Sequence, residues 1–354
     1  MACRLQFRRY RLPLRGVLRT AHETWTAREG IVVRLEDEAG RLGWGEVAPL
    51  PAFGTETADE AEAALRRLGE DPRSQDLDGV PAALRCTRQA LATARAELEC
   101  SARAERAEAA GPGAAGAEAR GVAALLPAGR EARAELAAKL EAGFRVFKWK
   151  VGVGDPAEEW GLLDELCGAL PSGGKLRLDA NGAWDRRTAE RWLERAAERP
   201  VEFVEQPCFA ARRDGEAAWR RAEDLLRGLA SDYPTPLALD ESLAGDDDLE
   251  RWVAQGWPGW FVLKPSLMAD APQALVRLRA ARANVVFSSA LETAVGARAA
   301  LRVAFSWEGA PTALGFGVWP LFAAARFDGP ALAPFVRRAD VERINPGEVW
   351  NALP

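Results

Sequence analysis

Lysines and carboxylates recur at the ends of short apolar segments in the C-terminal two thirds of the chain. They are Lys148, Lys150, Asp179, Glu205, Asp240 and Lys264. Carboxylates gathered in a low-dielectric site repel one another unless a cation joins them. Oxygen ligands favour Mg²⁺ or Mn²⁺, whereas zinc recruits histidine or cysteine, and the one histidine, His22, is distant in sequence. The pattern predicts a divalent-metal site flanked by lysines.

The segments that carry these residues alternate with helical patterns. We expect helices over 131–142, 156–170 and 185–198, and strands in GVAALLP, RVFKWKVG, KLRLDANG, VEFVEQP, PLALDES, WFVLKPS, NVVFSSA and PTALGFG. Eight such strands favour a parallel (β/α) barrel of the TIM type. A doubly wound sheet stays open as an alternative, although no glycine-rich phosphate turn follows the first strand.

A barrel brings the C-terminal ends of its strands to one mouth, which would make these distant residues neighbours. Side chains alternate along a strand, so Lys148 and Lys150 share one face while Phe147 and Trp149 share the other. We expect the charged face to point into the barrel. Mutual repulsion and a nearby metal would then lower the pKa of at least one lysine towards the range of a base.

The first third of the chain has a different pattern. RLQFRRYRLPL, EGIVVRLED and GRLGWGEVAPL indicate antiparallel strands, and helices are expected over about 56–70 and 80–106. We predict an α+β capping domain over 1–115, completed by a tail over about 325–354, and a barrel domain over 116–324. The segment 21–30, which includes His22, is expected to be a mobile loop over the barrel mouth.

Composition narrows the class of protein. The 354 residues are 48% hydrophobic and carry a net charge of −5, which predicts a globular protein without a nucleic-acid partner. No apolar stretch is long enough for a signal peptide or a membrane span, so we expect a cytoplasmic protein that does not bind membranes. Five cysteines without CxxC spacing indicate reduced thiols. The sequence leaves the oligomeric state open.

The motifs around the charged residues resemble a known family. KWK, LRLDANGAW, FVEQP, LALDESL and VLKPSL, in this order, are similar to the muconate-lactonising branch of the enolase superfamily. GWGEVAPLPAFGTET, FSSALETAVG and ALGFGVWPLF narrow the resemblance to the o-succinylbenzoate synthase family. The resemblance implies an α/β fold, with a modified (β/α)7β barrel and an N-terminal α+β cap.

The resemblance also implies roles for individual residues. Asp179, Glu205 and Asp240 would bind Mg²⁺, with Mn²⁺ able to replace it, and no organic cofactor would be needed. Lys150 would be the catalytic acid and base, and Lys264 the lysine on the opposite side of the substrate. Lys148 would be an electrostatic partner that orients the carboxylate of a small-molecule substrate.

The implied reaction is the syn-dehydration of 2-succinyl-6-hydroxy-2,4-cyclohexadiene-1-carboxylate to o-succinylbenzoate. This hydro-lyase step leads towards menaquinone or phylloquinone. Lys150 would remove the proton next to the carboxylate, the metal would stabilise the enediolate as is known for the enolase superfamily, and Lys150 would protonate the departing hydroxide. Lys264 would stabilise charge from the other face, including by cation–π contact with the ring.

Four further residues are candidates for substrate contact. They are Ser288 and Ser289 at the seventh strand and Gly315 and Gly317 at the eighth. Serine hydroxyls and backbone N–H groups there could bind the anionic succinyl tail. The two serines could equally cap the following helix, and the two glycines could simply satisfy turn geometry.

The dehydratase has alternatives among related enzymes and among proteins without catalytic activity. A mandelate-racemase-type enzyme needs a barrel histidine, which the chain does not have, and GFGVWP lacks the Asp-x-Asp of dipeptide epimerases. An N-acylamino acid racemase or a muconate-type cycloisomerase remains an alternative on the same lysines and metal. A scaffold without catalytic activity is disfavoured, because it has no use for buried lysines.

Overall fold

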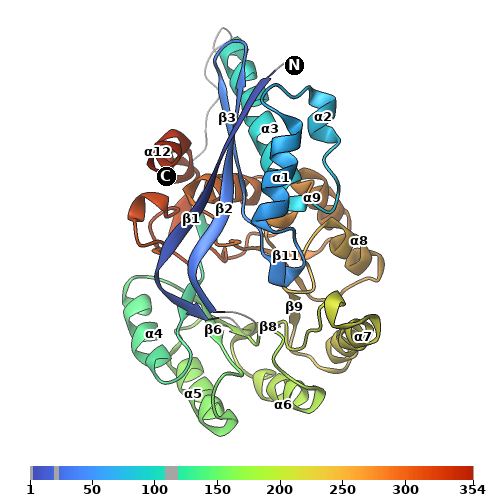
Figure 1. The fold of residues 1–354 in the computed structure, drawn as a ribbon. Helices are drawn as coiled ribbons and strands as arrows, with labels where there is room; N and C mark the ends of the chain where they lie inside the picture. Colours follow the sequence, from blue (N-terminus) through green and yellow to red (C-terminus); the bar gives the residue numbers. More distant parts are fainter. Residues whose placement is uncertain (1–2, 20–23, 108–118, 354) are drawn as a thin grey trace.

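The computed structural model describes residues 3–19, 24–107 and 119–353 (Figure 1). Its N-terminal part contains an antiparallel sheet in the order β1-β2-β3 with helices on one side. These elements are β1 (Cys3–Arg19), β2 (Thr24–Asp37), β3 (Leu42–Val47), η1 (Pro51–Phe53), α1 (Ala58–Leu68), α2 (Ser74–Asp78) and α3 (Arg85–Ala107).

The cap sheet has two apolar faces because its side chains alternate. Ile31, Val33 and Leu35 of β2 are buried in one hydrophobic cluster with α3, whereas Val32 belongs to the cluster that continues into the barrel. Gly43 in β3 allows α3 to approach closely, because a Cβ there would collide with the Ala94 carbonyl oxygen. The sheet therefore packs between its own helices and the barrel.

The second part is a parallel barrel with helices on its outside. Within the described residues, seven parallel strands follow the order β5 to β11. They are β5 (Ala124–Leu126), β6 (Val146–Lys150), β7 (Lys175–Asp179), β8 (Val201–Glu205), β9 (Leu237–Leu239), β10 (Trp260–Leu263) and β11 (Asn284–Phe287). The helices are α4 (Glu131–Glu141), α5 (Pro156–Ala169), α6 (Arg186–Ala196), α7 (Glu216–Asp232), α8 (Asp246–Ala254), α9 (Ala271–Ala280) and α10 (Ala294–Phe305), with η3 (Arg212–Asp214), η4 (Pro265–Leu267) and η5 (Ala325–Phe327) in the loops.

The eighth predicted strand, PTALGFG, closes the barrel without forming a regular strand. Leu314 forms an isolated parallel bridge with Val122 beside β5, and Gly315 forms one with Ser288 beside β11. A Cβ on Gly317 would collide with the carbonyl oxygen of Ala123, so the backbones meet too closely for a side chain. Two short contacts thus join the edges of the sheet where a strand was expected.

Alternation of side chains holds throughout the barrel, as the sequence predicts. Phe147, Trp149 and Leu178 are fully buried in the cluster between the strands and the helices. The barrel interior contains a small separate cluster of Phe203, Ala238, Val262 and Val286. Side chains two positions later on the same strands share the inward face and therefore point into the mouth. They are Glu205, Asp240, Lys264 and Ser288.

The expected loop over 21–30 is largely wrong. Residues from Thr24 onwards belong to β2 and pair with β1, with Trp25 opposite Leu18 and Ala27 opposite Pro13. The prediction relied on the polar composition of residues 21–30. It failed because the strand is formed by pairing with residues of β1, which lie outside that segment. His22 lies outside the described residues.

The C-terminal tail contacts both parts of the chain. Its strand β12 (Phe335–Arg337) pairs with β4 (Ala119–Gly121), and the helices α11 (Arg338–Glu342) and α12 (Pro346–Ala352) follow. Trp350 packs edge-on against Trp44 of the cap at 5.6 Å between ring centroids, and Arg8 donates to its carbonyl oxygen at 2.7 Å. The boundaries at 115 and 325 stay predictions. None of the helices in the described residues has the length and apolarity to cross a membrane.

Barrel closure can be tested by substituting Gly317. Gly317→Ala should lower the free energy of unfolding in urea by about 2 kcal/mol or more, because the new methyl group overlaps a backbone carbonyl. Gly228→Ala is the matched control: Gly228 lies within α7 with open space around it, so alanine should raise stability by about 0.5–1 kcal/mol. Equal effects of the two substitutions would contradict the closure described here.

Candidate active site

Three of the predicted site residues lie in one row across neighbouring strands. Lys150 of β6 is the Cα partner of Asp179 of β7, which is the partner of Glu205 of β8. Glu205 in turn lies opposite Ala238 of β9, which places Asp240 two residues further into the mouth. The parallel register therefore brings together residues that are far apart in sequence.

Lys148 lies between two of the carboxylates. Its Nζ is 2.8 Å from Asp179 Oδ2 and 2.7 Å from Glu205 Oε1. Both carboxylates are buried, so this shared ammonium compensates charge that would otherwise be costly to bury.

Lys264 enters the mouth from the opposite side. It is buried, and its Nζ contacts Asp240 Oδ1. The same Nζ lies over the ring of Phe53, 4.7 Å from the centroid, so the cap covers this lysine. The structure thus brings together all six predicted metal ligands and lysines.

The lysines differ in their protonation equilibria. Burial lowers the pKa of Lys150, and the charge of Lys148 adds to this against the opposing effect of Asp179. Burial also lowers the pKa of Lys264 to about 7. For Lys148, burial acts in the same direction, but the Asp179 and Glu205 carboxylates outweigh it and raise the pKa. Burial, rather than the predicted repulsion between lysines, is thus the main cause of the lowered pKa values.

The loops after β7 and β8 hold the row in place. Asn181 and Gln206 adopt left-handed backbone conformations, with φ of 44° and 38°, which non-glycine residues rarely adopt. Gln206 is fully buried, and its side-chain oxygen accepts from the backbone N–H groups of Asp240 and Ser242 at 2.9 and 3.1 Å. Such strained residues cluster at functional sites. Sequence analysis assigned no role to Gln206, although a polar residue between a strand end and a proline was a usable signal.

The mouth fits a hard divalent cation by its chemistry. Asp179, Glu205 and Asp240 supply only oxygen ligands, and Glu241 adds a fourth buried carboxylate whose pKa is raised to about 8 by burial and by Asp179 and Glu205. In the described residues, no three His, Cys, Asp or Glu side chains form a ready metal cage. Lys148 and Lys264 contact the same carboxylate groups that a metal would need.

Three of the four predicted substrate-contact residues have hydrogen-bond partners within the protein, and the fourth, Gly317, lies close to another backbone segment. Ser288 Oγ donates to the carbonyl oxygen of Gly315 at 3.2 Å, and Gly315 donates its N–H to Phe287 at 2.7 Å. Ser289 Oγ donates to Glu292 at 2.8 Å. Neither serine caps α10, whose N-cap is Thr293. Gly317 packs against the backbone at Ala123. Their contact with substrate stays a prediction.

A buried polar cluster at the junction of cap and barrel was missed by sequence analysis. Glu46 of β3 accepts hydrogen bonds from the Tyr10 hydroxyl, the Thr293 backbone and hydroxyl, and the Gly296 N–H. Arg28 of β2 donates to the carbonyl oxygens of Ala290 and Leu291 at 3.2 and 3.1 Å. The cap therefore binds the segment between β11 and α10, and only the tertiary structure reveals this.

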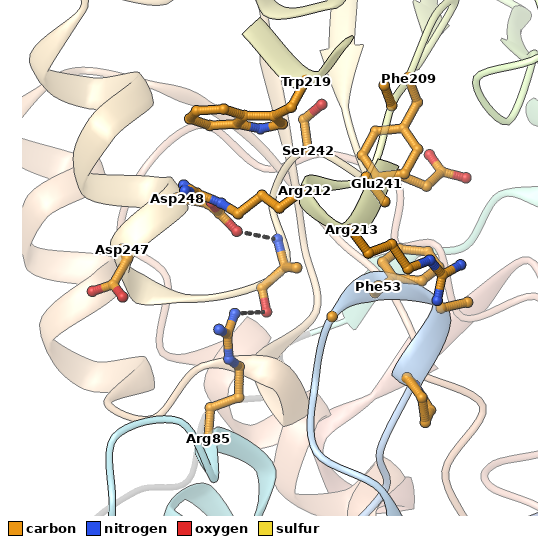
Figure 2. A pocket seen from close by; sticks show the side chains of 16 residues that line it. Phe53, Arg85, Phe209, Arg212, Arg213, Trp219, Glu241, Ser242, Asp247 and Asp248 are labelled. Carbon is orange, nitrogen blue, oxygen red and sulfur yellow. Dashed lines mark hydrogen bonds and ion pairs between the residues drawn. The ribbon is translucent and has the colours of Figure 1, made fainter. Parts of the chain in front are cut away.

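A cavity of about 370 Å³ adjoins the mouth (Figure 2). The cap contributes the segment 51–54 to its wall, and the barrel contributes the loops after β8 and β9. Glu241 and Phe53 line it, so it borders both the carboxylates and Lys264.

Comparison with known proteins connects this site to a family. Residues 131–331 match the family described as enolase C-terminal domain-like, and residues 3–97 match the MenC N-terminal domain. The o-succinylbenzoate synthase of Thermosynechococcus vestitus is 38% identical over 320 residues, which cover 89% of this chain and 92% of that protein. The chain belongs to the o-succinylbenzoate synthase family. The predicted membership of the enolase superfamily is confirmed.

Further relatives agree with this assignment. The o-succinylbenzoate synthase of Klebsiella pneumoniae is 31% identical, over 84% of this chain and 86% of that protein. The crystal structure of o-succinylbenzoate synthase from Thermosynechococcus elongatus BP-1, complexed with Mg in the active site, matches with a TM-score of 0.76 and 37% identity, over 91% of this chain and 95% of that chain. The N-succinyl Arg/Lys racemase of Bacillus cereus has the same TM-score but 18% identity, and it shares the fold alone; it covers 99% of this chain and 97% of that one.

The family is one of lyases, and the fold is the predicted α/β barrel with an N-terminal cap.

One buried acid beside the barrel mouth offers a test of how burial changes the pKa of a carboxyl group in this site. Glu292 is fully buried, and its Oε1 has no hydrogen-bond partner in the described residues. Burial raises its pKa to about 7, and Glu46 acts in the same direction.

Glu292 should make stability depend on pH. The folded protein keeps a proton on Glu292 that the unfolded chain releases above about pH 4.5, so folding is destabilised as pH rises from about 4.5 to about 7. Glu292→Gln removes this effect, and its free energy of unfolding relative to wild type should rise by about 3 kcal/mol between pH 4.5 and 8. Urea titrations at several pH values measure this difference. The exposed Glu198→Gln is the control, and a difference for Glu292→Gln that does not change with pH would contradict the assignment.

Proposed function

We propose that Lys150 and Lys264 carry out the syn-dehydration of 2-succinyl-6-hydroxy-2,4-cyclohexadiene-1-carboxylate to o-succinylbenzoate in menaquinone biosynthesis. The family membership gives the reaction, and the placement of the lysines carries the assignment of roles. Lys150 stands in the row with Asp179 and Glu205, and Lys264 stands on the other side of the mouth. A substrate bound between them presents one face to each lysine.

Syn-elimination needs one group that acts twice on the same face. Lys150 takes the proton from the carbon next to the ring carboxylate, and the resulting ammonium then delivers a proton to the departing hydroxide on that face. Lys148 is held between two carboxylates and orients the substrate carboxylate. Lys264 supplies positive charge to the opposite face, as it already does towards Phe53.

Asp179, Glu205 and Asp240 would hold Mg²⁺, and Mn²⁺ could replace it because both prefer oxygen ligands. When bound, the cation would offset negative charge that develops on the substrate carboxylate. The mouth has the surplus of buried carboxylate that such an ion requires, since Glu241 stands beside the three ligands. A cytoplasmic location and the absence of nucleic-acid partners complete this proposal.

The role of Lys150 can be tested by substitution. Lys150→Ala should lower kcat by about two to four orders of magnitude, because the reaction loses its acid and base. The loss of cyclohexadiene absorbance in the presence of Mg²⁺ measures the rate. Lys175→Ala is the matched control, because Lys175 is an exposed lysine at the other end of β7. No conversion by wild type, together with Mg²⁺-dependent deuterium incorporation into an N-succinylamino acid, would instead indicate a racemase.

The metal ligands can be tested without an assay of activity. Mg²⁺ at about 100 times its Kd should stabilise the folded protein by about 2.7 kcal/mol, and EDTA should reverse the rise in Tm. Asp179→Asn should remove the rise, because it takes a charged ligand from the site. Asp164→Asn, at an exposed ion pair with Arg199, should keep it. An unchanged rise for Asp179→Asn would exclude Asp179 as a ligand.

A further inference from the structure

The chain makes a tight turn directly after Lys150, the last residue of β6. The N–H of Val151 donates to the carbonyl oxygen of Asp179 at 2.9 Å, so the pairing of β6 with β7 continues one residue past the lysine. Gly152 then adopts a left-handed φ of 78°, which begins the turn over 152–154. The backbone that follows Lys150 is therefore directed by this turn.

One carboxylate of the following helix holds the turn. Glu159 of α5 accepts the N–H of Gly152 at 2.9 Å through Oε2. Its Oε1 accepts the N–H groups of Val153 and Gly154 at 3.1 and 3.0 Å. Successive backbone N–H groups that surround one anion form a nest, an arrangement that binds anions in proteins. Here the anion is a side chain of the same loop and helix.

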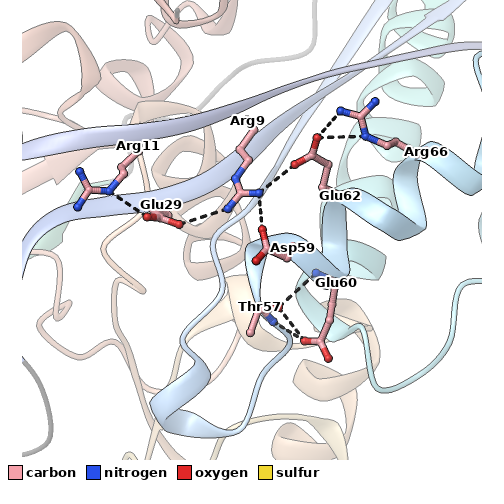
Figure 3. A network of polar contacts seen from close by, with 8 residues as sticks. All are labelled: Arg9, Arg11, Glu29, Thr57, Asp59, Glu60, Glu62 and Arg66. Carbon is pink, nitrogen blue, oxygen red and sulfur yellow. Dashed lines mark hydrogen bonds and ion pairs between the residues drawn. The ribbon is translucent and has the colours of Figure 1, made fainter.

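Glu159 differs from the carboxylates that form ion pairs on the surface. In the cap, Asp59 and Glu62 of α1 pair with Arg9 at the surface (Figure 3). Exposed pairs of this kind contribute little stability singly. Glu159 is only 4% exposed, and within the described residues its partners are backbone N–H groups, without an ion pair. Because a buried carboxylate is costly without compensation, these three hydrogen bonds stabilise its charge.

The other side of the turn packs against the loop after β7. A Cβ on Gly152 would collide with Nε1 of Trp184, so the backbone lies directly on the indole. Trp184 is buried and stacks on Trp192 of α6, with 5.1 Å between ring centroids and 13° between the ring planes. The turn is thus enclosed between a carboxylate and a stacked indole, and Glu159 keeps it in this position.

We propose that Glu159 is a positioning residue for the dehydration, because it holds the turn that directs the backbone of Lys150. This inference rests on the proposed function, in which Lys150 acts twice on one face of the substrate. An acid and base must stay within hydrogen-bond reach of the proton and of the departing hydroxide. A displacement of about 1 Å can lower the rate by about 100-fold. Glu159 acts through Lys150 and is not itself a catalytic residue.

Glu159→Gln tests the nest with little change in shape. One carboxylate oxygen becomes an NH2 group, which cannot accept a hydrogen bond from the backbone N–H groups. We expect kcat to fall about tenfold with KM within about twofold, because Lys148, Lys264 and the metal ligands keep their positions. The loss of cyclohexadiene absorbance in the presence of Mg²⁺ measures both constants. An unchanged kcat would overturn the inference.

The matched control is the neighbouring glutamate on the same helix. Glu158 is exposed and pairs with the exposed Arg130 at 3.3 Å, so Glu158→Gln removes the same charge outside the nest. It should change neither kcat nor KM. A fall in kcat as large as that of Glu159→Gln would overturn the inference, since the loss would then follow from the charge of α5 and not from the turn.

A double substitution separates positioning of Lys150 from a general loss of structure. If Glu159 acts through Lys150, the variant with Glu159→Gln and Lys150→Ala should match Lys150→Ala alone within about twofold. A general structural effect would lower the activity of both backgrounds by the same factor, and this result would overturn the inference. Full activity of Lys150→Ala, by contrast, would contradict the proposed function itself.

Gly152→Ala displaces the turn from its other side and provides the test if Glu159→Gln does not fold. It leaves the carboxylate in place but puts a methyl group against Trp184 and strains a left-handed backbone conformation. The same fall in kcat is expected, again without effect in the Lys150→Ala background. Gly161→Ala, in α5 with open space around it, is the control and should keep wild-type kcat. Wild-type kcat in Gly152→Ala would overturn the link between the turn and Lys150.

Discussion

Burial of charge at the barrel mouth is the constraint on which the rest of the site depends. Asp179, Glu205 and Asp240 are all buried, and an uncompensated charge is costly in such surroundings. Lys148 compensates the first two and Lys264 the third. A divalent cation held by the same carboxylates would compete with these ammonium groups for the carboxylate oxygens.

The backbone has to hold these charges in register, and it does so at some local cost. Parallel pairing aligns Lys150, Asp179 and Glu205, and Gln206 then fixes the start of the next loop through two backbone N–H groups. Gln206 and Asn181 both adopt left-handed backbone conformations. Such conformations cost free energy, which the surrounding hydrogen bonds must offset. Strain and buried charge therefore occur in the same few residues.

Much of this site could be predicted because alternation along a strand is a local property. The quoted segments alone indicate that Lys148 and Asp179 face inward and that Trp149 packs outward, and the structure agrees. What depends on non-local contacts could not be predicted. The pKa of Lys148 rises because carboxylates of two other strands surround it. Other features also depend on contacts between distant parts of the chain. They are the hydrogen bond of Ser289 to Glu292, the pairing of residues 24–27 with β1, and the isolated bridges that replace the eighth strand.

The barrel strands carry the charged residues of the mouth, whereas loops and the cap surround it, so the same fold can accommodate different substrates. Proteins below 25% identity, among them an N-succinyl Arg/Lys racemase, share this fold. Fold alone therefore does not select a substrate. Lysines and carboxylates on strand ends can act on any carboxylate with an adjacent proton, so discrimination must come from groups that contact the remainder of the molecule. In this chain such groups would come from the loops around the mouth and from the cap segment that bears Phe53, which lie outside the row of charges.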